Sequence, residues 1–145
     1  MQKNLAPYRV IYGDTDQMGI VYYANFLRWF EMGRTELLRQ IGATYSCVEA
    51  AGFYFPVTEV SCRYLKPARF DDEIVVETTL TALGRATLDF SYKITRKNDG
   101  QILAEGWTRH ACVDGKGKLV KISPALETIL KSALAPASNT GKNSA

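Results

Sequence analysis

The sequence predicts an α+β domain in which an antiparallel sheet of four to six strands curls around one long helix. Two observations carry this prediction: a single long amphipathic segment near the amino end, and a series of alternating β-type segments after residue 53. The connections between those segments are too short for parallel crossovers, so consecutive strands are expected to pair antiparallel. A sheet that wraps the helix buries both apolar faces most simply.

The length and composition are those of one globular domain. A chain of 145 residues with 46% hydrophobic and 23% charged residues needs no second domain, and we expect the domain to span residues 1–134. The polar segment 135–145 has little to bury and is expected to be disordered. No stretch approaches the roughly 20 apolar residues of a membrane helix, and no secretory signal is evident, so a cytoplasmic location without membrane insertion is expected.

The cysteine content argues against a disulfide-rich or zinc-binding protein, and the net charge argues against a nucleic-acid-binding one. The three cysteines are odd in number and widely separated, which argues against a disulfide framework or a zinc site. The formal net charge of +3 suits an anionic ligand but is too small for a nucleic-acid-binding surface.

The amino-terminal third predicts a strand, a polar turn and the long helix. Residues 8–12 are rich in β-formers, and residues 13–19 carry turn chemistry. Asn25 is expected to cap a helix over residues 26–41, which Gly42 ends. Gly33 lies on the buried stripe of this helix and predicts a close approach of another backbone. The apolar positions of that stripe are Phe26, Phe30, Leu37 and Ile41.

The remainder predicts a short helix, a series of strands and a final helix. The short helix is expected over residues 45–51, and Leu119–Ile122 is expected to add a last strand. Ser123 caps the final helix, with Pro124 at its first position. The strands are predicted over residues 55–65, 73–83, 86–95 and 101–113.

The polar turn between the first strand and the long helix has three interpretations. As a calcium loop counted from Asp14, it would place Met18 and Asn25 where oxygen ligands are required, so that interpretation is poor. As a structural loop, Asp14 and Asp16 would only tie the turn together. As a catalytic loop, a carboxylate just before a helix start would lie beside free backbone N–H groups and the positive end of the helix dipole, which stabilise an oxyanion.

The catalytic interpretation needs no histidine, because an aspartate that is ionised at neutral pH can attack a thioester or activate water. The chain has one histidine, His110, which is expected to be a satisfied strand residue. No Gly-x-Ser-x-Gly motif is present to support a serine triad.

At this point two segments carry a family resemblance. The first runs from Tyr12 to Phe26 as YGDTDQMGIVYYANF, followed by Arg28-Trp29-Phe30-Glu31, and the second is Tyr64-Leu-Lys-Pro-Ala-Arg-Phe-Asp-Asp72. They resemble hotdog-fold acyl-CoA thioesterases of the 4-hydroxybenzoyl-CoA and Tol-Pal-associated types. The resemblance implies a central helix wrapped by a five- to six-stranded antiparallel sheet. It also implies homodimers joined edge to edge, often paired into homotetramers, with active sites at the dimer interface.

Carried over residue by residue, the resemblance makes Asp16 the catalytic carboxylate and Asp14 a supporting residue. The backbone N–H of Tyr23 polarises the thioester carbonyl, and the tyrosine side chain is incidental to that role. Many Tol-Pal-associated members have histidine at this position, so the sequence departs from them here. Three neighbours are also assigned to substrate binding: Gly19, Tyr22 and Asn25.

Further candidates for substrate binding lie outside the loop. Coenzyme A is polyanionic, so exposed cations are expected near its path: Arg85 in the Gly84-Arg85 turn matches a basic position of the family, and Lys118 is a weaker candidate. Glu31 either contacts the site or pairs with Arg34 three residues later on the helix surface.

The expected function is hydrolysis of an acyl-CoA thioester to a carboxylic acid and coenzyme A, without a metal or other cofactor. The carboxylate acts as nucleophile or general base, a choice that the sequence leaves open. A hotdog dehydratase is a poorer alternative, because it would carry a histidine at the active helix. A non-catalytic hotdog module that binds acyl-CoA or a protein remains open, and only an assay separates it.

Overall fold

The computed structural model describes residues 2–136. Most of the predicted tail, residues 137–145, lies outside the described residues, whereas Ala135 donates a backbone hydrogen bond to Leu80 at 2.9 Å and is therefore attached to the sheet. The helices are α1 (Asn25–Gln40), α2 (Tyr45–Ala50) and α3 (Pro124–Ala133), with a 3-10 turn, η1, at Tyr12–Asp14. The strands are β1 (Lys3–Arg9), β2 (Val57–Tyr64), β3 (Glu73–Leu83), β4 (Thr87–Arg96) and β5 (Ile102–Ala111).

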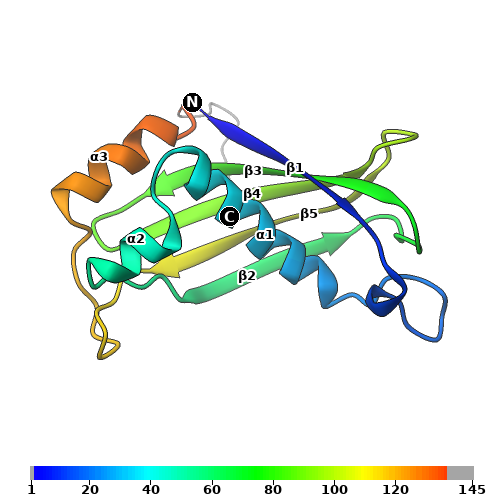
Figure 1. Cartoon of the computed structure of the whole chain (residues 1–145), viewed down its shortest axis with the longest axis horizontal. Helices are drawn as coiled ribbons and strands as arrows, with labels where there is room; N and C mark the ends of the chain where they lie inside the picture. The colour runs from blue at the N-terminus through cyan, green and yellow to red at the C-terminus, as the bar shows by residue number, and fades with distance from the viewer. Residues whose placement is uncertain (1, 137–145) are drawn as a thin grey trace.

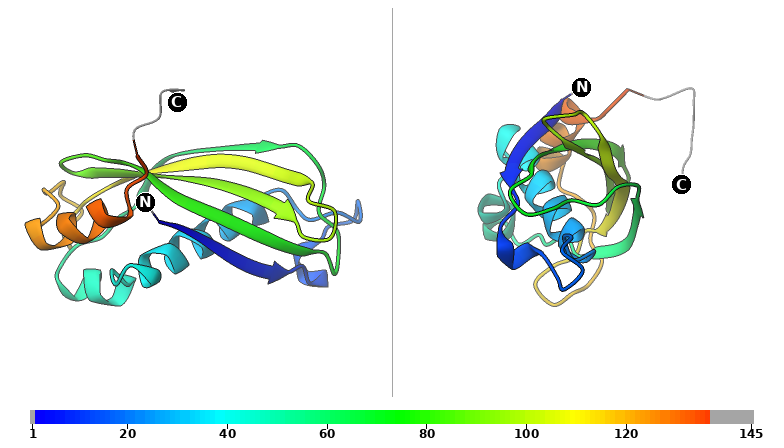
Figure 2. Two further views of the ribbon diagram at one scale, coloured as in Figure 1. Left: turned by 90° about the horizontal axis from the view of Figure 1, so that it is seen from above. Right: turned by 90° about the vertical axis from the view of Figure 1, so that its right-hand side faces the viewer.

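The sheet has five strands in the order β1-β3-β4-β5-β2, and every pair is antiparallel. It curls around α1, so the predicted α+β hotdog arrangement is confirmed (Figures 1 and 2). The expectation that consecutive strands after residue 53 pair is confirmed for β3–β4 and β4–β5 but was wrong for the step from β2 to β3, because β2 pairs with β5 and β3 pairs with β1. Residues 65–72 carry the chain from one side of the sheet to the other, which leaves β1 and β2 as the edges.

The first strand was predicted too late in the chain. Strand β1 ends at Arg9, and the predicted residues 10–12 lead instead into η1. Pairing with β3 decides this boundary: Lys3 lies opposite Thr79 and Arg9 opposite Glu73, so β1 matches the first two-thirds of β3. Beyond Arg9 no β3 residue remains to pair.

Helix α1 begins one residue earlier than predicted. Its N-cap is Ala24, which has no side-chain acceptor, so the prediction that Asn25 caps the helix was wrong. The predicted stop is confirmed, because Gly42 has φ +87°, a left-handed conformation that favours glycine. The other capping prediction is also confirmed, since the Ser123 side chain accepts a hydrogen bond from the Leu126 N–H at the start of α3.

The core lies between α1 and the concave face of the sheet. Phe30 is fully buried and stacks on Tyr92 of β4 with ring centroids 4.2 Å apart, and Leu37 is equally buried one turn beyond Gly33. Each such side chain contributes roughly 1.5–3 kcal/mol by leaving water. Arg34 is also buried on this face, which the helical pattern had not indicated.

Gly33 sits where α1 comes closest to β3. A Cβ atom at this position would meet the side chain of Thr78 and would lie 2.8 Å from Cγ1 of Val76. The predicted close approach is therefore present, but side chains make it rather than a backbone. Glycine here lets the helix settle onto the sheet.

Helices α2 and α3 cover the end of the sheet at which β3 ends and β4 begins (Figure 1). Leu126 and Leu130 of α3 pack with Phe90 of β4 and Val48 of α2 around a small enclosed gap of about 10 Å³. That gap is no larger than the space that one water molecule needs. Among residues 2–136, no helix combines the length and apolar character that crossing a membrane requires.

Candidate active site

Asp14 anchors the loop between β1 and α1. Its side chain is only 1% exposed and accepts hydrogen bonds from the Tyr8 hydroxyl at 2.7 Å and the Ile11 N–H at 3.0 Å. The Arg28 guanidinium lies 3.5 Å from the same carboxylate. The main-chain oxygen of Asp14 accepts a hydrogen bond from the Asn25 side-chain amide at 2.8 Å. Asp14 thereby ties the first turn of α1 to β1 and has the supporting role that was expected.

Asp16 lies in a tight turn and is half-exposed. Its Oδ1 accepts a hydrogen bond from the Met18 N–H at 2.9 Å, and its main-chain oxygen accepts one from Gly19 at 2.9 Å. Gly19 has φ +80°, which closes this turn. Among the described residues nothing donates to Oδ2 of Asp16, so one carboxylate oxygen is available to solvent or a ligand.

The backbone at the start of α1 offers a free donor. The Val21 and Tyr22 N–H groups bond to Ala68 and Asp14, at 2.8 and 2.9 Å. Within residues 2–136 the N–H of Tyr23 has no such acceptor, and it stands two residues before Asn25, the first residue of α1. The positive end of the helix dipole lies at this point, so the free N–H is suited to an anionic oxygen.

An apolar groove of about 350 Å³ adjoins this donor. The Tyr64 hydroxyl at the end of β2 donates to the main-chain oxygen of Tyr23 at 3.0 Å and so connects the two walls of the groove. Burial, followed by the neighbouring Cys62, raises the pKa of Tyr64, which keeps this hydroxyl protonated as a donor. The groove is lined by Ile20, Val21, Tyr23, Phe26, Tyr64, Leu65, Lys66 and Pro67.

Asp16 is not among the residues that line this groove in the single chain. The pKa of Tyr22 is raised first by the adjacent Tyr23 phenol and most weakly by the negative charge of Asp16. The centroids of the Tyr22 and Tyr23 rings lie 4.7 Å apart. The structure therefore brings Asp16 and Tyr23 into one loop, but a single chain does not place both in one groove.

The groove beside Tyr23 is lined by neither of the two predicted substrate contacts on α1, Asn25 and Glu31. The Asn25 side-chain amide donates a hydrogen bond to the main-chain oxygen of Asp14 and so stabilises the loop. Glu31 is exposed and lines a different hollow, on the outer surface of α1, with Arg28 and Glu36. The alternative pairing of Glu31 with Arg34 was wrong, because Arg34 points into the core and donates to Tyr92 at 3.5 Å.

The two predicted coenzyme A contacts lie at the other end of the molecule. Arg85 follows β3, and Lys118 lies in the hairpin between β5 and α3, whereas the Asp16 loop adjoins the opposite end of β3 (Figure 1). An 11-residue strand is about 35 Å long. One chain therefore does not bring Arg85 or Lys118 to Asp16.

Sequence reasoning missed Tyr64 and Lys66 as groove residues. The segment from Tyr64 to Asp72 was identified only as a turn, although it supplies four groove residues. The alternation of β2 could have placed Tyr64 on the concave face, since it lies opposite the buried Ala104. Its proximity to Tyr23, 41 positions away, follows only from the curl of the sheet.

His110 is a buried residue of β5 away from this loop, as expected. Its Nδ1 lies 3.0 Å from the Phe55 carbonyl and its Nε2 lies 2.8 Å from Oγ1 of Thr108. Burial lowers the pKa of His110 to about 4, so the imidazole is neutral at neutral pH. Among the described residues, no group of three or more His, Cys, Asp and Glu side chains has a metal-binding arrangement.

Comparison with known proteins gives one consistent result. A family model described as the thioesterase-like superfamily matches residues 10–132. A Bacillus subtilis protein named putative acyl-CoA thioesterase YneP is 37% identical over 105 residues, 72% of this chain and 75% of the relative. The acyl-CoA thioesterase YbgC of Haemophilus influenzae is 37% identical over 116 residues, 79% of this chain and 84% of the relative.

Solved structures agree with the fold. The crystal structure of a hypothetical protein from Thermus thermophilus superposes with a TM-score of 0.85 at 33% identity, and the match covers 91% of this chain and 98% of the other.

Proposed function

Because the chain belongs to the thioesterase-like superfamily, we propose that it is an acyl-CoA thioesterase that hydrolyses a thioester to a carboxylic acid and free coenzyme A. Two relatives at 37% identity are named as acyl-CoA thioesterases, and the apolar groove beside Tyr23 suits the acyl part of such a substrate. The observation that carries the proposal is the N–H of Tyr23 at the positive end of α1, for which the described part of the chain supplies no hydrogen-bond acceptor.

The proposed chemistry uses two groups of the loop. The Tyr23 N–H binds the thioester oxygen and stabilises the negative charge that develops on it. Asp16 either attacks the carbonyl carbon, so that water hydrolyses the resulting anhydride, or removes a proton from an attacking water. In both cases the C–S bond breaks, the sulfur leaves as coenzyme A thiolate and takes up a proton, and the oxygen of water ends in the acid.

A homodimer that joins two sheets through β2 would complete this site. Strand β2 lies at the edge of the sheet, so along its free edge no strand among residues 2–136 pairs with its backbone N–H and C=O groups. Its Val57, Val60 and Tyr64 side chains are 44–48% exposed. Antiparallel pairing of two β2 strands reverses one chain relative to the other. The end of one subunit that carries Arg85 and Lys118 then approaches the other subunit's Asp16 loop, where these cations would bind the phosphates of coenzyme A.

The test is release of free thiol from short, long and aromatic acyl-CoAs by the wild type and by Asp16→Asn. We expect kcat to fall at least about 100-fold in the variant, the low end for loss of an acid-base group. Glu49→Gln is a matched control, because it makes the same carboxylate-to-amide change on the exposed surface of α2. Tyr23→Phe should retain near wild-type kcat, because the proposed donor is its backbone.

Two results would contradict this proposal. An Asp16→Asn enzyme with unchanged kcat would remove the carboxylate from the mechanism. A folded wild type that binds acyl-CoA but releases no thiol from any member of the panel would favour the non-catalytic binding module.

A further inference from the structure

The turn before α1 is hydrogen-bonded at both peptide units that flank the Cα atom of Tyr23. The main-chain oxygen of Tyr22 accepts a hydrogen bond from the Asn25 N–H at 2.9 Å. The main-chain oxygen of Tyr23 accepts one from the Phe26 N–H at 3.2 Å. In a planar trans peptide unit the C=O and N–H bonds point in opposite directions. Because the Tyr22 C=O is directed towards α1, the Tyr23 N–H is directed away from the helix.

One side chain of the sheet adds a further bond to this turn. The Tyr64 hydroxyl donates to the main-chain oxygen of Tyr23 at 3.0 Å, a shorter contact than the bond from the Phe26 N–H to the same oxygen. Within residues 2–136 no other hydrogen bond joins a strand of the sheet to residues 22–25. The peptide units around the Tyr23 donor are therefore held to the sheet through one hydroxyl group.

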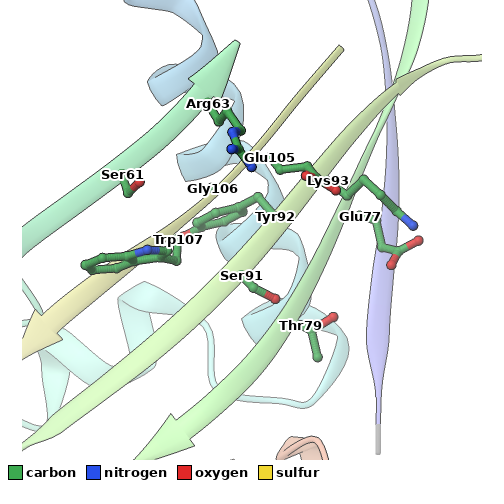
Figure 3. Close-up of a pocket in the computed structure, with 10 residues that line it drawn as sticks. All are labelled: Ser61, Arg63, Glu77, Thr79, Ser91, Tyr92, Lys93, Glu105, Gly106 and Trp107. Atoms are coloured by element: carbon green, nitrogen blue, oxygen red, sulfur yellow. The ribbon is translucent and has the colours of Figure 1, made fainter. Parts of the chain in front are cut away.

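Tyr64 is itself held in place by its strand and by its ring. Ser61 and Arg63 of β2 line a hollow on the outer face of the sheet (Figure 3). Because alternate residues of a strand point to opposite faces, Tyr64 points to the concave face, where its ring meets Phe26 edge-on with centroids 5.2 Å apart. The two backbone N–H groups that follow Tyr64 both donate to the Leu103 carbonyl, at 2.8 and 3.1 Å. The hydroxyl thus extends from an anchored strand, which positions a partner more exactly than a loop does.

A simpler explanation is that Tyr64 only forms one wall of the apolar groove. An aromatic ring suits that purpose, because it presents a large apolar surface to an acyl group. That explanation accounts for the ring but not for the hydroxyl, since phenylalanine would provide the same apolar wall. The hydroxyl is directed at a main-chain oxygen of the residue that carries the candidate donor.

We propose that Tyr64 is a positioning residue, whose hydroxyl fixes the peptide units around Tyr23 so that the Tyr23 N–H stays directed at the thioester oxygen. This role rests on the function proposed above. A donor stabilises developing charge best when it is already in place before the reaction, and loss of one such donor costs roughly 100- to 1,000-fold in kcat. Loss of a bond that only orients the donor should cost less, about 10-fold, because a small displacement weakens the donor without removing it.

Steady-state kinetics of Tyr64→Phe on the acyl-CoA panel tests this role. Because the hydroxyl acts on the carbonyl donor and not on the acyl group, kcat should fall by about the same factor for every substrate, about 10-fold, while KM stays within about 2-fold of the wild type. Tyr54→Phe is the matched control: it makes the same change at a tyrosine of similar exposure, 38% against 45%, which precedes the opposite end of β2. It should have wild-type kcat and KM.

Binding of an analogue separates positioning from a role in the groove wall. A thioether of coenzyme A that has the chain of the best substrate, with CH2 in place of the carbonyl group, offers no oxygen to the Tyr23 N–H. Tyr64→Phe should bind this thioether with the wild-type Kd, because the apolar wall is unchanged. A Kd that rises by the same factor as kcat falls would assign Tyr64 to the groove wall and overturn the positioning role.

Failure of this role can be told apart from failure of the proposed function. If the wild type hydrolyses members of the panel and Tyr64→Phe has the same kcat, or loses rate only through a higher KM, the positioning role is overturned and the proposed hydrolysis stands. If the folded wild type releases no thiol from any acyl-CoA, both are overturned.

Discussion

Protonation of His110 should destabilise the fold, and the structure gives both the reason and the size of the effect. Because the Phe55 carbonyl can only accept, Nδ1 carries the proton and Nε2 accepts from the Thr108 hydroxyl. The Tyr92 hydroxyl then donates to Thr108 at 2.6 Å and accepts from Arg34. A second proton on His110 would make Nε2 a donor to Thr108, so that the hydroxyl hydrogen of either Thr108 or Tyr92 would have no acceptor in this cluster.

The magnitude follows from the pKa of His110, which burial and, more weakly, the charge of Arg34 lower from 6.5 to about 4, against the opposing bond to Phe55. Above pH 6.5 the imidazole is neutral in both the folded and the unfolded chain and contributes nothing to the pH dependence. Between pH 6.5 and 4 only the unfolded chain takes up the proton. The free energy of unfolding therefore falls by about 1.4 kcal/mol for each pH unit, about 3 kcal/mol in all.

The assay compares wild type with His110→Asn by urea unfolding at one protein concentration from pH 7.5 to 5. Asparagine keeps a donor for Phe55 but does not titrate, so the difference in unfolding free energy between the two proteins should shrink by about 2 kcal/mol over this range. Since the chain has one histidine, NMR also follows its imidazole directly. A difference that stays constant with pH, or a folded-state midpoint between pH 6 and 7, would refute the reasoning.

Two further substitutions test the packing around α1. Gly33→Ala should lower the free energy of unfolding by about 1–2 kcal/mol despite the better helix propensity of alanine, because the new methyl group meets Thr78. Thermal or urea unfolding measures this loss. Adding Thr78→Ala to the same chain should recover part of it. Tyr8→Phe should cost about 1.5–3 kcal/mol, the range for a hydrogen bond to a charged group, because Asp14 loses its 2.7 Å donor. A Tyr8→Phe protein as stable as the wild type would mean that Asp14 does not hold the loop in place.

The candidate site was partly predictable for a physical reason. The Asp16 turn, the start of α1 and the free N–H between them are neighbours in the chain, so sequence spacing alone places them together. The Tyr64 wall of the groove, by contrast, comes from a strand 41 positions away. Arg85 and Lys118 lie at the opposite end of the same chain from Asp16, so their predicted role depends on a second subunit, which sequence spacing does not show.

The sequence by itself determined the long helix, four of the five strands to within two residues and the two later helices, because the periods of 3.6 and 2 and the capping residues act over a few neighbours. Only the tertiary structure decided that β2 pairs with β5, that Arg34 turns inward, and that side chains rather than backbone approach Gly33. These features depend on how the sheet curls, and that curl minimises the exposed apolar area of the whole chain rather than of any one segment.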